Sequence, residues 1–95
     1  MAEYRLSNEA KEDLIRIHHY GVGRFGMTQA DKYFVSFFEC FETIAQRPFA
    51  FESVEYIRKG YRRCVCGSDI IYYRINDGIV EIMAIVGRQD LDNVL

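Results

Sequence analysis

The stretch that decides the fold is Ser53–Val86, SVEYIRKGYRRCVCGSDIIYYRINDGIVEIMAIV, which is rich in Val, Ile and Tyr. These residues favour strands, while Gly67-Ser68 and Asn76-Asp77-Gly78 are turn signals, the second typical of a hairpin. The pattern therefore predicts an antiparallel meander of four strands, at residues 54–58, 61–66, 69–76 and 79–86.

Upstream of the meander, the apolar residues follow helical spacing. Ser7 or Asn8 is expected to cap a first helix, whose apolar stripe ends near Gly21 and Gly23, with Gly26 closing the turn. The stripe consists of Ala10, Leu14, Ile17 and Gly21.

A second helix has the stronger apolar pattern. Thr28 followed by Asp31 resembles a capping box, and Pro48 is expected to stop the helix because it pushes Arg47 out of the helical region. One wide face, most simply a core face, carries Ala30, Tyr33, Phe34, Phe37, Phe38, Phe41, Ile44 and Ala45.

The order of elements indicates an α+β fold. Tyr4–Leu6 is expected to form a short N-terminal edge strand, and the two helices should form an antiparallel hairpin packed on the C-terminal antiparallel sheet. At 95 residues, of which 49% are hydrophobic, the chain fits a single domain spanning residues 1–95. A domain of this size has a small core and would gain from a partner that covers apolar surface.

The composition limits the classes of partner. A net charge of −2 argues against a general or sequence-specific nucleic-acid binder, although a local basic patch remains open. No apolar run approaches a membrane span, and the residues after Met1 lack the apolar core of a secretory signal. We therefore expect a cytoplasmic protein without a membrane partner.

The cysteines and histidines point away from metal chemistry. Cys40, Cys64 and Cys66 are expected to be reduced thiols, the last two on one face of a strand as small core residues. His18 and His19 diverge around a helix, so they make a poor ligand pair. No metal and no cofactor are predicted.

Basic residues cluster between the first two predicted strands of the meander. Arg58, Lys59, Arg62 and Arg63 flank Gly60-Tyr61, and a regular strand would place Arg62 and Arg63 on opposite faces. The cluster is either a contact patch for an acidic partner or phosphates, or a charged strand edge that prevents aggregation. Arg88 and Asp90 form a second candidate site, or simply a local ion pair after the last strand.

Several short motifs, taken in order, resemble a known family. They are Tyr4-Arg5-Leu6-Ser7 with Asp13-Leu14, Phe25-Gly26 with Gln29-Ala30 and Tyr33, Ile44-Ala45 with Pro48, and Ile57-Arg58-Lys59-Gly60-Tyr61-Arg62-Arg63-Cys64 before Gly67-Ser68 and Ile71-Tyr72-Tyr73-Arg74. Across nearly the whole chain, this order resembles the ParE-type toxins of the ParE/RelE superfamily. There are two departures from the family pattern. Asp69 replaces a common His. In the segment that usually reads R-I-L-H-x-R-M-D, here residues 83–90, Met83 and Val86 replace the first Arg and the His, while Arg88 and Asp90 are kept.

The resemblance implies the toxin of a type II toxin–antitoxin pair. Such a toxin would inhibit DNA gyrase and replication by binding, without catalysis or cofactor, and a ParD-like antitoxin would neutralise it. Residues expected to contact antitoxin or target are Arg58, Lys59, Tyr61, Arg62, Arg63, Arg74, Arg88 and Asp90.

Two alternatives remain at this stage. One is a RelE-like ribosome-dependent mRNA endonuclease, and the other is a non-toxic module that only binds an antitoxin. RNA cleavage needs a base, an acid and cations at the phosphate. Aligned with RelE-like enzymes, the expected strand Arg falls near the apolar Ile70, the closing Arg is Gln89, and no Tyr follows Tyr73.

Overall fold

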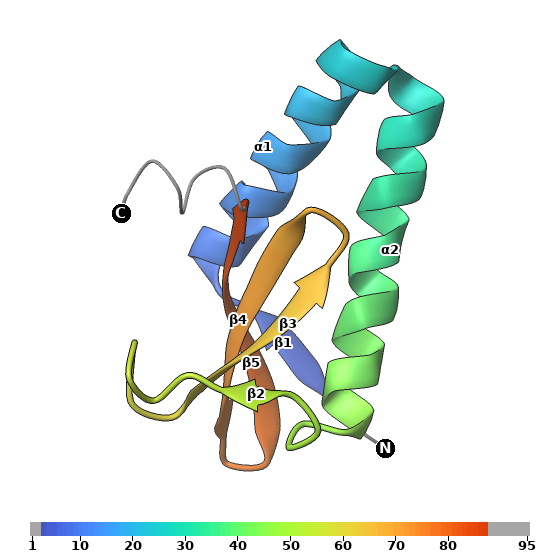
Figure 1. The fold of residues 1–95 in the computed structure, drawn as a ribbon. Helices are drawn as coiled ribbons and strands as arrows, with labels where there is room; N and C mark the ends of the chain where they lie inside the picture. Colours follow the sequence, from blue (N-terminus) through green and yellow to red (C-terminus); the bar gives the residue numbers. More distant parts are fainter. Residues whose placement is uncertain (1–2, 88–95) are drawn as a thin grey trace.

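The computed structural model describes residues 3–87 as a helical hairpin packed on a five-stranded sheet (Figure 1). The elements are β1 (Tyr4–Leu6), α1 (Asn8–Phe25), α2 (Met27–Gln46), β2 (Glu52–Ser53), β3 (Tyr61–Cys66), β4 (Asp69–Asn76) and β5 (Ile79–Gly87). The predicted α+β fold is confirmed, and so are the N-terminal strand and the last three strands of the meander.

The sheet is mixed, with strand order β1-β5-β4-β3-β2. β3, β4 and β5 form the predicted antiparallel meander, whereas β1 lies parallel to β5, with Tyr4 opposite Val80. A parallel neighbour cannot follow directly in the chain, and here the helical hairpin, β2, β3 and β4 all lie between β1 and β5. The chain thus leaves β1 at the sheet edge and crosses one face as two helices.

α1 begins where the sequence predicts but ends later. Ser7 is the N-cap, and its Oγ accepts a hydrogen bond from the Ala10 amide at 3.0 Å. The helix continues through Gly21 to Phe25 before Gly26 ends it with a φ of 89°. At Gly21 the two helices come close, because a Cβ there would lie 3.3 Å from the Cβ of Ala30. The glycine that was expected to end the helix therefore serves helix packing.

α2 starts earlier than predicted. Gly26 is the only residue between the helices, so Thr28 already lies inside α2 and no side chain caps its first turn. The expected capping box is wrong, and Asp31 instead contacts His18 Nε2 at 2.8 Å across the hairpin. The end is confirmed: α2 stops at Gln46, and Arg47 before Pro48 is non-helical.

The sheet has an inner face, which the helices cover, and an outer face, which they do not. The main core lies between helices and inner face, where Cys64 and Cys66 are both buried, as predicted. Its fully buried members include Phe37, Phe41, Ile44, Ile71, Tyr73 and Ile82. A smaller cluster on the outer face comprises Val54, Ile70 and Tyr72, with Tyr61 and Val86 beside them.

The predicted strand at residues 54–58 is wrong. Glu52–Ser53 pairs with β3, and the Val54 amide still donates to the Tyr61 carbonyl at 2.8 Å. The chain then turns, because the Val54 carbonyl accepts hydrogen bonds from the amides of Ile57 and Arg58 at 2.8 and 3.1 Å. Val54 itself is completely buried in the outer-face cluster. The other apolar residues of the segment, Tyr56 and Ile57, are 74% and 55% exposed, so the segment is a turn anchored by Val54 alone.

Candidate functional site

The basic cluster is split between a turn and one strand. Arg58 and Lys59 lie in the exposed turn before β3, whereas Tyr61, Arg62 and Arg63 lie within β3. The Arg58 guanidinium stands over the ring of Tyr61, 5.7 Å from its centroid. The structure thus brings these residues together around the start of β3.

Arg62 and Arg63 lie on opposite sides of β3, as predicted, and each already has a partner within the chain. Arg62 Nη1 donates to the Phe51 carbonyl at 2.7 Å, and its guanidinium lies 5.1 Å from the centroid of the Phe49 ring. Arg63 Nε contacts Glu52 Oε2 at 2.6 Å. Arg62 therefore helps hold the loop after α2, and Arg63 is the more available of the two cations.

Arg74 extends this surface across the outer face. It lies opposite Tyr61 in the β3–β4 pairing, and its Nε contacts Glu81 Oε1 at 2.7 Å. The other Glu81 oxygen lies 3.1 Å from Arg5 Nε. The hydrogen bond from Arg74 holds the pKa of Glu81 below its ordinary value. We call Arg58, Lys59, Tyr61, Arg63 and Arg74 the outer basic surface.

The remaining two predicted contacts, Arg88 and Asp90, lie outside the described residues. Within residues 3–87, no group of three or more His, Cys, Asp or Glu side chains is arranged to hold a metal ion. In the same part of the chain, no helix is both long and apolar enough to cross a membrane.

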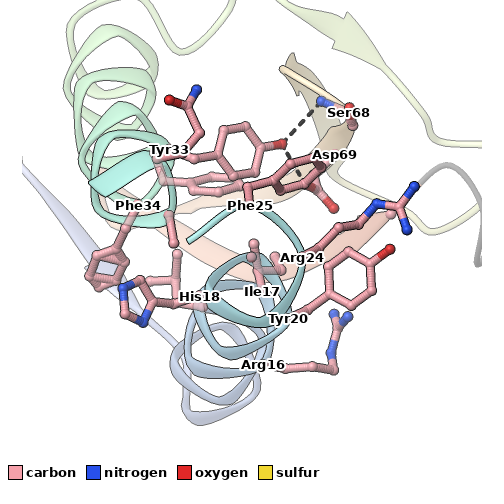
Figure 2. Close-up of a pocket in the computed structure, with 16 residues that line it drawn as sticks. Arg16, Ile17, His18, Tyr20, Arg24, Phe25, Tyr33, Phe34, Ser68 and Asp69 are labelled. Carbon is pink, nitrogen blue, oxygen red and sulfur yellow. Dashed lines mark hydrogen bonds between the residues drawn. The ribbon is translucent and has the colours of Figure 1, made fainter. Parts of the chain in front are cut away.

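Sequence reasoning missed a groove of about 660 Å³ between the helical hairpin and the β3–β4 turn (Figure 2). Its walls include Ile17 and Phe34, and at its rim the rings of Tyr20 and Phe25 are 57% and 62% exposed. Arg24 also lines it, with its guanidinium 5.6 Å from the ring centroid of Phe25. In the sequence, the groove could have been suspected from Tyr20 and Phe25, two aromatic residues of the first helix that lie outside its apolar stripe.

A cluster of hydrogen-bonded groups around the Tyr33 hydroxyl, which we call the polar knot, closes one end of the groove. The Tyr33 hydroxyl lies 2.5 Å from Asp69 Oδ2 and accepts a hydrogen bond from the Ser68 amide at 3.0 Å (Figure 2). It also lies 3.1 Å from the Cys66 carbonyl. Burial, with a contribution from Asp69, raises the pKa of Tyr33 well above its ordinary value. Asp69 is itself 8% exposed, so the groove ends at a nearly buried carboxylate.

Gly67 makes the polar knot possible. Its φ is 61°, and a Cβ at this position would lie 2.5 Å from Cε1 of Tyr33. Glycine is thus required both by backbone conformation and by the approach of the Tyr33 ring.

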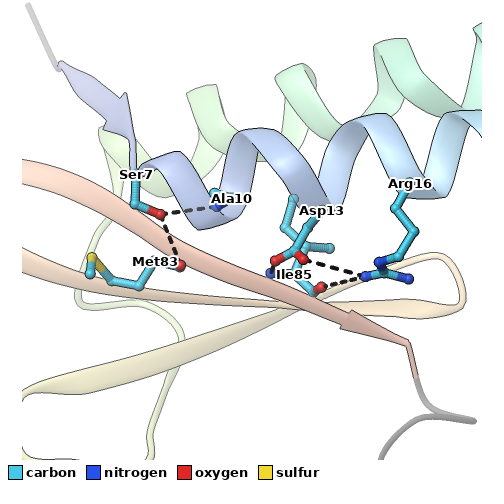
Figure 3. Close-up of polar contacts among 6 residues, drawn as sticks. All are labelled: Ser7, Ala10, Asp13, Arg16, Met83 and Ile85. Atoms are coloured by element: carbon cyan, nitrogen blue, oxygen red, sulfur yellow. Dashed lines mark hydrogen bonds and ion pairs between the residues drawn. The ribbon is translucent and has the colours of Figure 1, made fainter.

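Helix α1, which carries Ile17, Tyr20 and Phe25 of the groove, is fixed to β5 (Figure 3). Ser7 Oγ donates to the Met83 carbonyl at 2.9 Å, and Asp13 Oδ2 accepts from the Ile85 amide at 2.9 Å. Arg16 Nη2 lies 3.3 Å from the Ile85 carbonyl. Helix α1 and the closed end of the groove are therefore both held by hydrogen bonds within the chain.

Comparisons with known proteins agree on one family. The sequence model described as "ParE toxin of type II toxin-antitoxin system, parDE" matches residues 4–91. Toxin ParE1 of Caulobacter vibrioides is 41% identical over 75 residues, which cover 79% of this chain and 78% of that protein. Toxin ParE1 of Mycobacterium tuberculosis is 28% identical over 96 residues, covering 99% and 98%.

Solved structures show the same fold. A chain of the chromosomal ParDE system from P. aeruginosa matches with a TM-score of 0.81 and 18% identity, covering 92% of this chain and 96% of that one. A chain of the RelBE2 toxin–antitoxin complex from Mycobacterium tuberculosis matches with a TM-score of 0.59 and 16% identity, covering 92% and 98%. At these identities the likeness concerns the fold alone.

Proposed function

Because the chain belongs to the ParE family of toxins of type II toxin–antitoxin systems, we propose that it stops growth by binding DNA gyrase and that a ParD-like antitoxin neutralises it. The match to the family over residues 4–91 is the observation that carries this proposal. The toxin acts as a binding protein and not as a catalyst.

The chemistry of the described residues supports a non-catalytic toxin. RNA cleavage requires a positioned base and acid as well as cations, and loss of such a group costs about 10²–10⁴-fold in rate. Ile70, at the position where RelE-like enzymes carry an arginine, is 5% exposed within the outer-face cluster. Arg62 and Arg63, which could supply positive charge, are bound to the Phe51 carbonyl and to Glu52.

The groove is the surface best suited to the antitoxin. It is narrow, mostly apolar and bordered by the exposed rings of Tyr20 and Phe25, and amphipathic segments bind such grooves through their apolar side. An antitoxin tail that orders on this surface would bury these rings. Acidic residues further along the tail would then reach the outer basic surface.

A supercoiling assay with purified toxin and gyrase tests the target. We expect the toxin to block supercoiling of relaxed plasmid and to leave cleaved DNA when detergent stops the reaction, since a gyrase poison traps the cleavage complex. Adding the antitoxin first should restore supercoiling. Unaffected gyrase, together with codon-dependent cuts on programmed ribosomes mapped by primer extension, would replace this proposal with the endonuclease.

Charge variants test the antitoxin surface separately. Arg58 and Arg63 changed together to Ala should weaken the complex with the antitoxin, by about 2–5 kcal/mol if a buried charge pair is broken. Lys11→Ala with Lys32→Ala is the matched control, because it removes two exposed cations of the helices. Equal affinity and equal salt dependence for both double variants would exclude the outer basic surface from this interface.

A further inference from the structure

Two of the three cysteines lie in direct contact across the core. Cys40, half-buried on α2, directs its thiol to the sulfur of Cys66 on β3, and the two Sγ atoms are 2.7 Å apart. The Cys66 thiol in turn faces the Ser36 carbonyl at 3.8 Å. Cys64 is buried on the same face, but its thiol is directed to the Val65 carbonyl.

We propose that Cys40 and Cys66 form a reversible redox pair, whose disulfide joins α2 to β3 when a hydroperoxide reaches Cys40. In the first step, the Cys40 sulfur attacks the peroxide, the O–O bond breaks, and Cys40 sulfenic acid and one water (or alcohol) form. In the second step, the Cys66 sulfur displaces the hydroxyl group as water and the S–S bond forms. The cysteines together lose two electrons and two protons, and a dithiol reductant restores them by exchange.

The two sulfurs differ in access, which sets this order. Cys66 is 5% exposed, so the oxidant meets the half-buried Cys40 first. Burial, with the neighbouring Cys40, raises the pKa of Cys66 to about 12, so this group attacks slowly at neutral pH. Contact between the sulfurs offsets the low thiolate fraction, because the second step is intramolecular.

The surroundings of the pair favour formation of the disulfide over oxidation of Cys40 by a second peroxide. Besides Cys40, the groups facing Cys66 are Ser36 on α2 and Cys64 on β3, with Tyr33 bound to the Cys66 carbonyl. A sulfenic acid on Cys40 would therefore have a thiol in contact before a second peroxide could arrive.

A disulfide here would change the behaviour of the domain. It would close a loop that contains the end of α2, β2 and the turn bearing Arg58 and Lys59. Cross-linking a loop of this length restricts the unfolded chain and raises the melting temperature, by roughly 10 °C for a small domain. Oxidation would thus convert a marginal domain into a more persistent one.

The experiment treats the purified full chain with hydrogen peroxide and maps its thiols by mass spectrometry under non-reducing conditions. We expect a loss of two hydrogens per chain, a Cys40–Cys66 linked peptide, and a higher melting temperature that dithiothreitol reverses. A Cys40–Cys64 link, an intermolecular link, sulfinic acid without a disulfide, or an unchanged melting temperature would each overturn the proposal.

Single variants sharpen the assignment. Cys40→Ser and Cys66→Ser should abolish the disulfide, whereas Cys64→Ser is the matched control and should retain it. Peptide mapping of the unsubstituted chain gives the answer even if a core variant does not fold. A disulfide that persists in Cys40→Ser would also reject the pair.

Discussion

The two faces of the sheet solve the same problem of burial in different ways. The inner face is covered by two helices whose buried aromatic residues include Phe37 and Phe41. Within residues 3–87 no helix covers the outer face, where a single turn places Val54 against Ile70 and Tyr72. Because far more side chains are buried on the inner face, we expect it to supply most of the stability and the outer face to carry charge.

The polar contacts of the two faces differ in their exposure to solvent. On the inner side, the polar knot of Tyr33 and Asp69 is largely removed from water. On the outer side, arginines pair with Glu52 and Glu81 in contact with solvent. Exposed ion pairs contribute little, roughly 0–1 kcal/mol each, so the outer pairs can open for a partner at low cost.

The largest difference between the faces should appear when each loses one buried side chain. Phe41→Ala should destabilise the fold by about 3–5 kcal/mol, because a fully buried ring in contact with Tyr4 and Phe38 leaves a large cavity. Val54→Ala should cost about 2 kcal/mol, since fewer methyl groups are removed from a smaller cluster. Urea unfolding measures both, and equal losses would contradict the unequal division of stability.

Two glycines with positive φ offer a matched comparison between the groove and the outer loop. Gly67→Ala should cost about 3 kcal/mol, through left-handed strain and a clash with Tyr33. Gly60→Ala should cost about 1 kcal/mol, since its φ of 81° carries strain but no atom lies within 4 Å of the new Cβ.

A double-mutant cycle separates strain from clash. Tyr33→Ala removes the ring, so the cost of Gly67→Ala in that background should fall to the value for Gly60→Ala. An undiminished cost would mean that the polar knot does not require Gly67.

The sequence predicted the regular parts of the fold better than their connections. The strands at 61–66 and 69–76 are confirmed to the residue because strong turn signals bound them, whereas the turn after Ser53 imitates a strand through its alternating apolar residues. Side-chain contacts between distant elements, such as Tyr33 with Asp69, leave no local pattern. Exposed rings on a helix become a site only when folding places a second wall opposite them.

Substitutions at Arg62 and Arg63 allow the two faces to be compared within one strand. Arg62→Ala should destabilise the chain by about 2 kcal/mol, because the Phe51 carbonyl loses a charge-assisted hydrogen bond and Phe49 loses its cation. Arg63→Ala should cost less than about 1 kcal/mol, since its pair with Glu52 is exposed. Thermal unfolding of both variants measures the difference, and a greater loss for Arg63→Ala would reverse the assignment of the structural cation.

The smallest effect concerns Glu81 at the centre of the outer ion pairs. The hydrogen bond from Arg74, with Arg5 on the other oxygen, lowers the pKa of Glu81 below 4.5, the value expected in the unfolded chain. The unfolded chain therefore binds the proton more readily, so the contribution of Glu81 to stability is present above pH 4.5 and is lost as the pH falls through the folded-state pKa. Arg74→Ala should raise the pKa of Glu81 toward 4.5 in an NMR titration, while Arg63→Ala, which leaves this pair intact, should not change it. High salt should also reduce the shift, because the pair faces solvent. A Glu81 pKa unaffected by both Arg74→Ala and salt would mean that these exposed ion pairs do not set the pKa of Glu81, and the contrast between the two faces would lose this support.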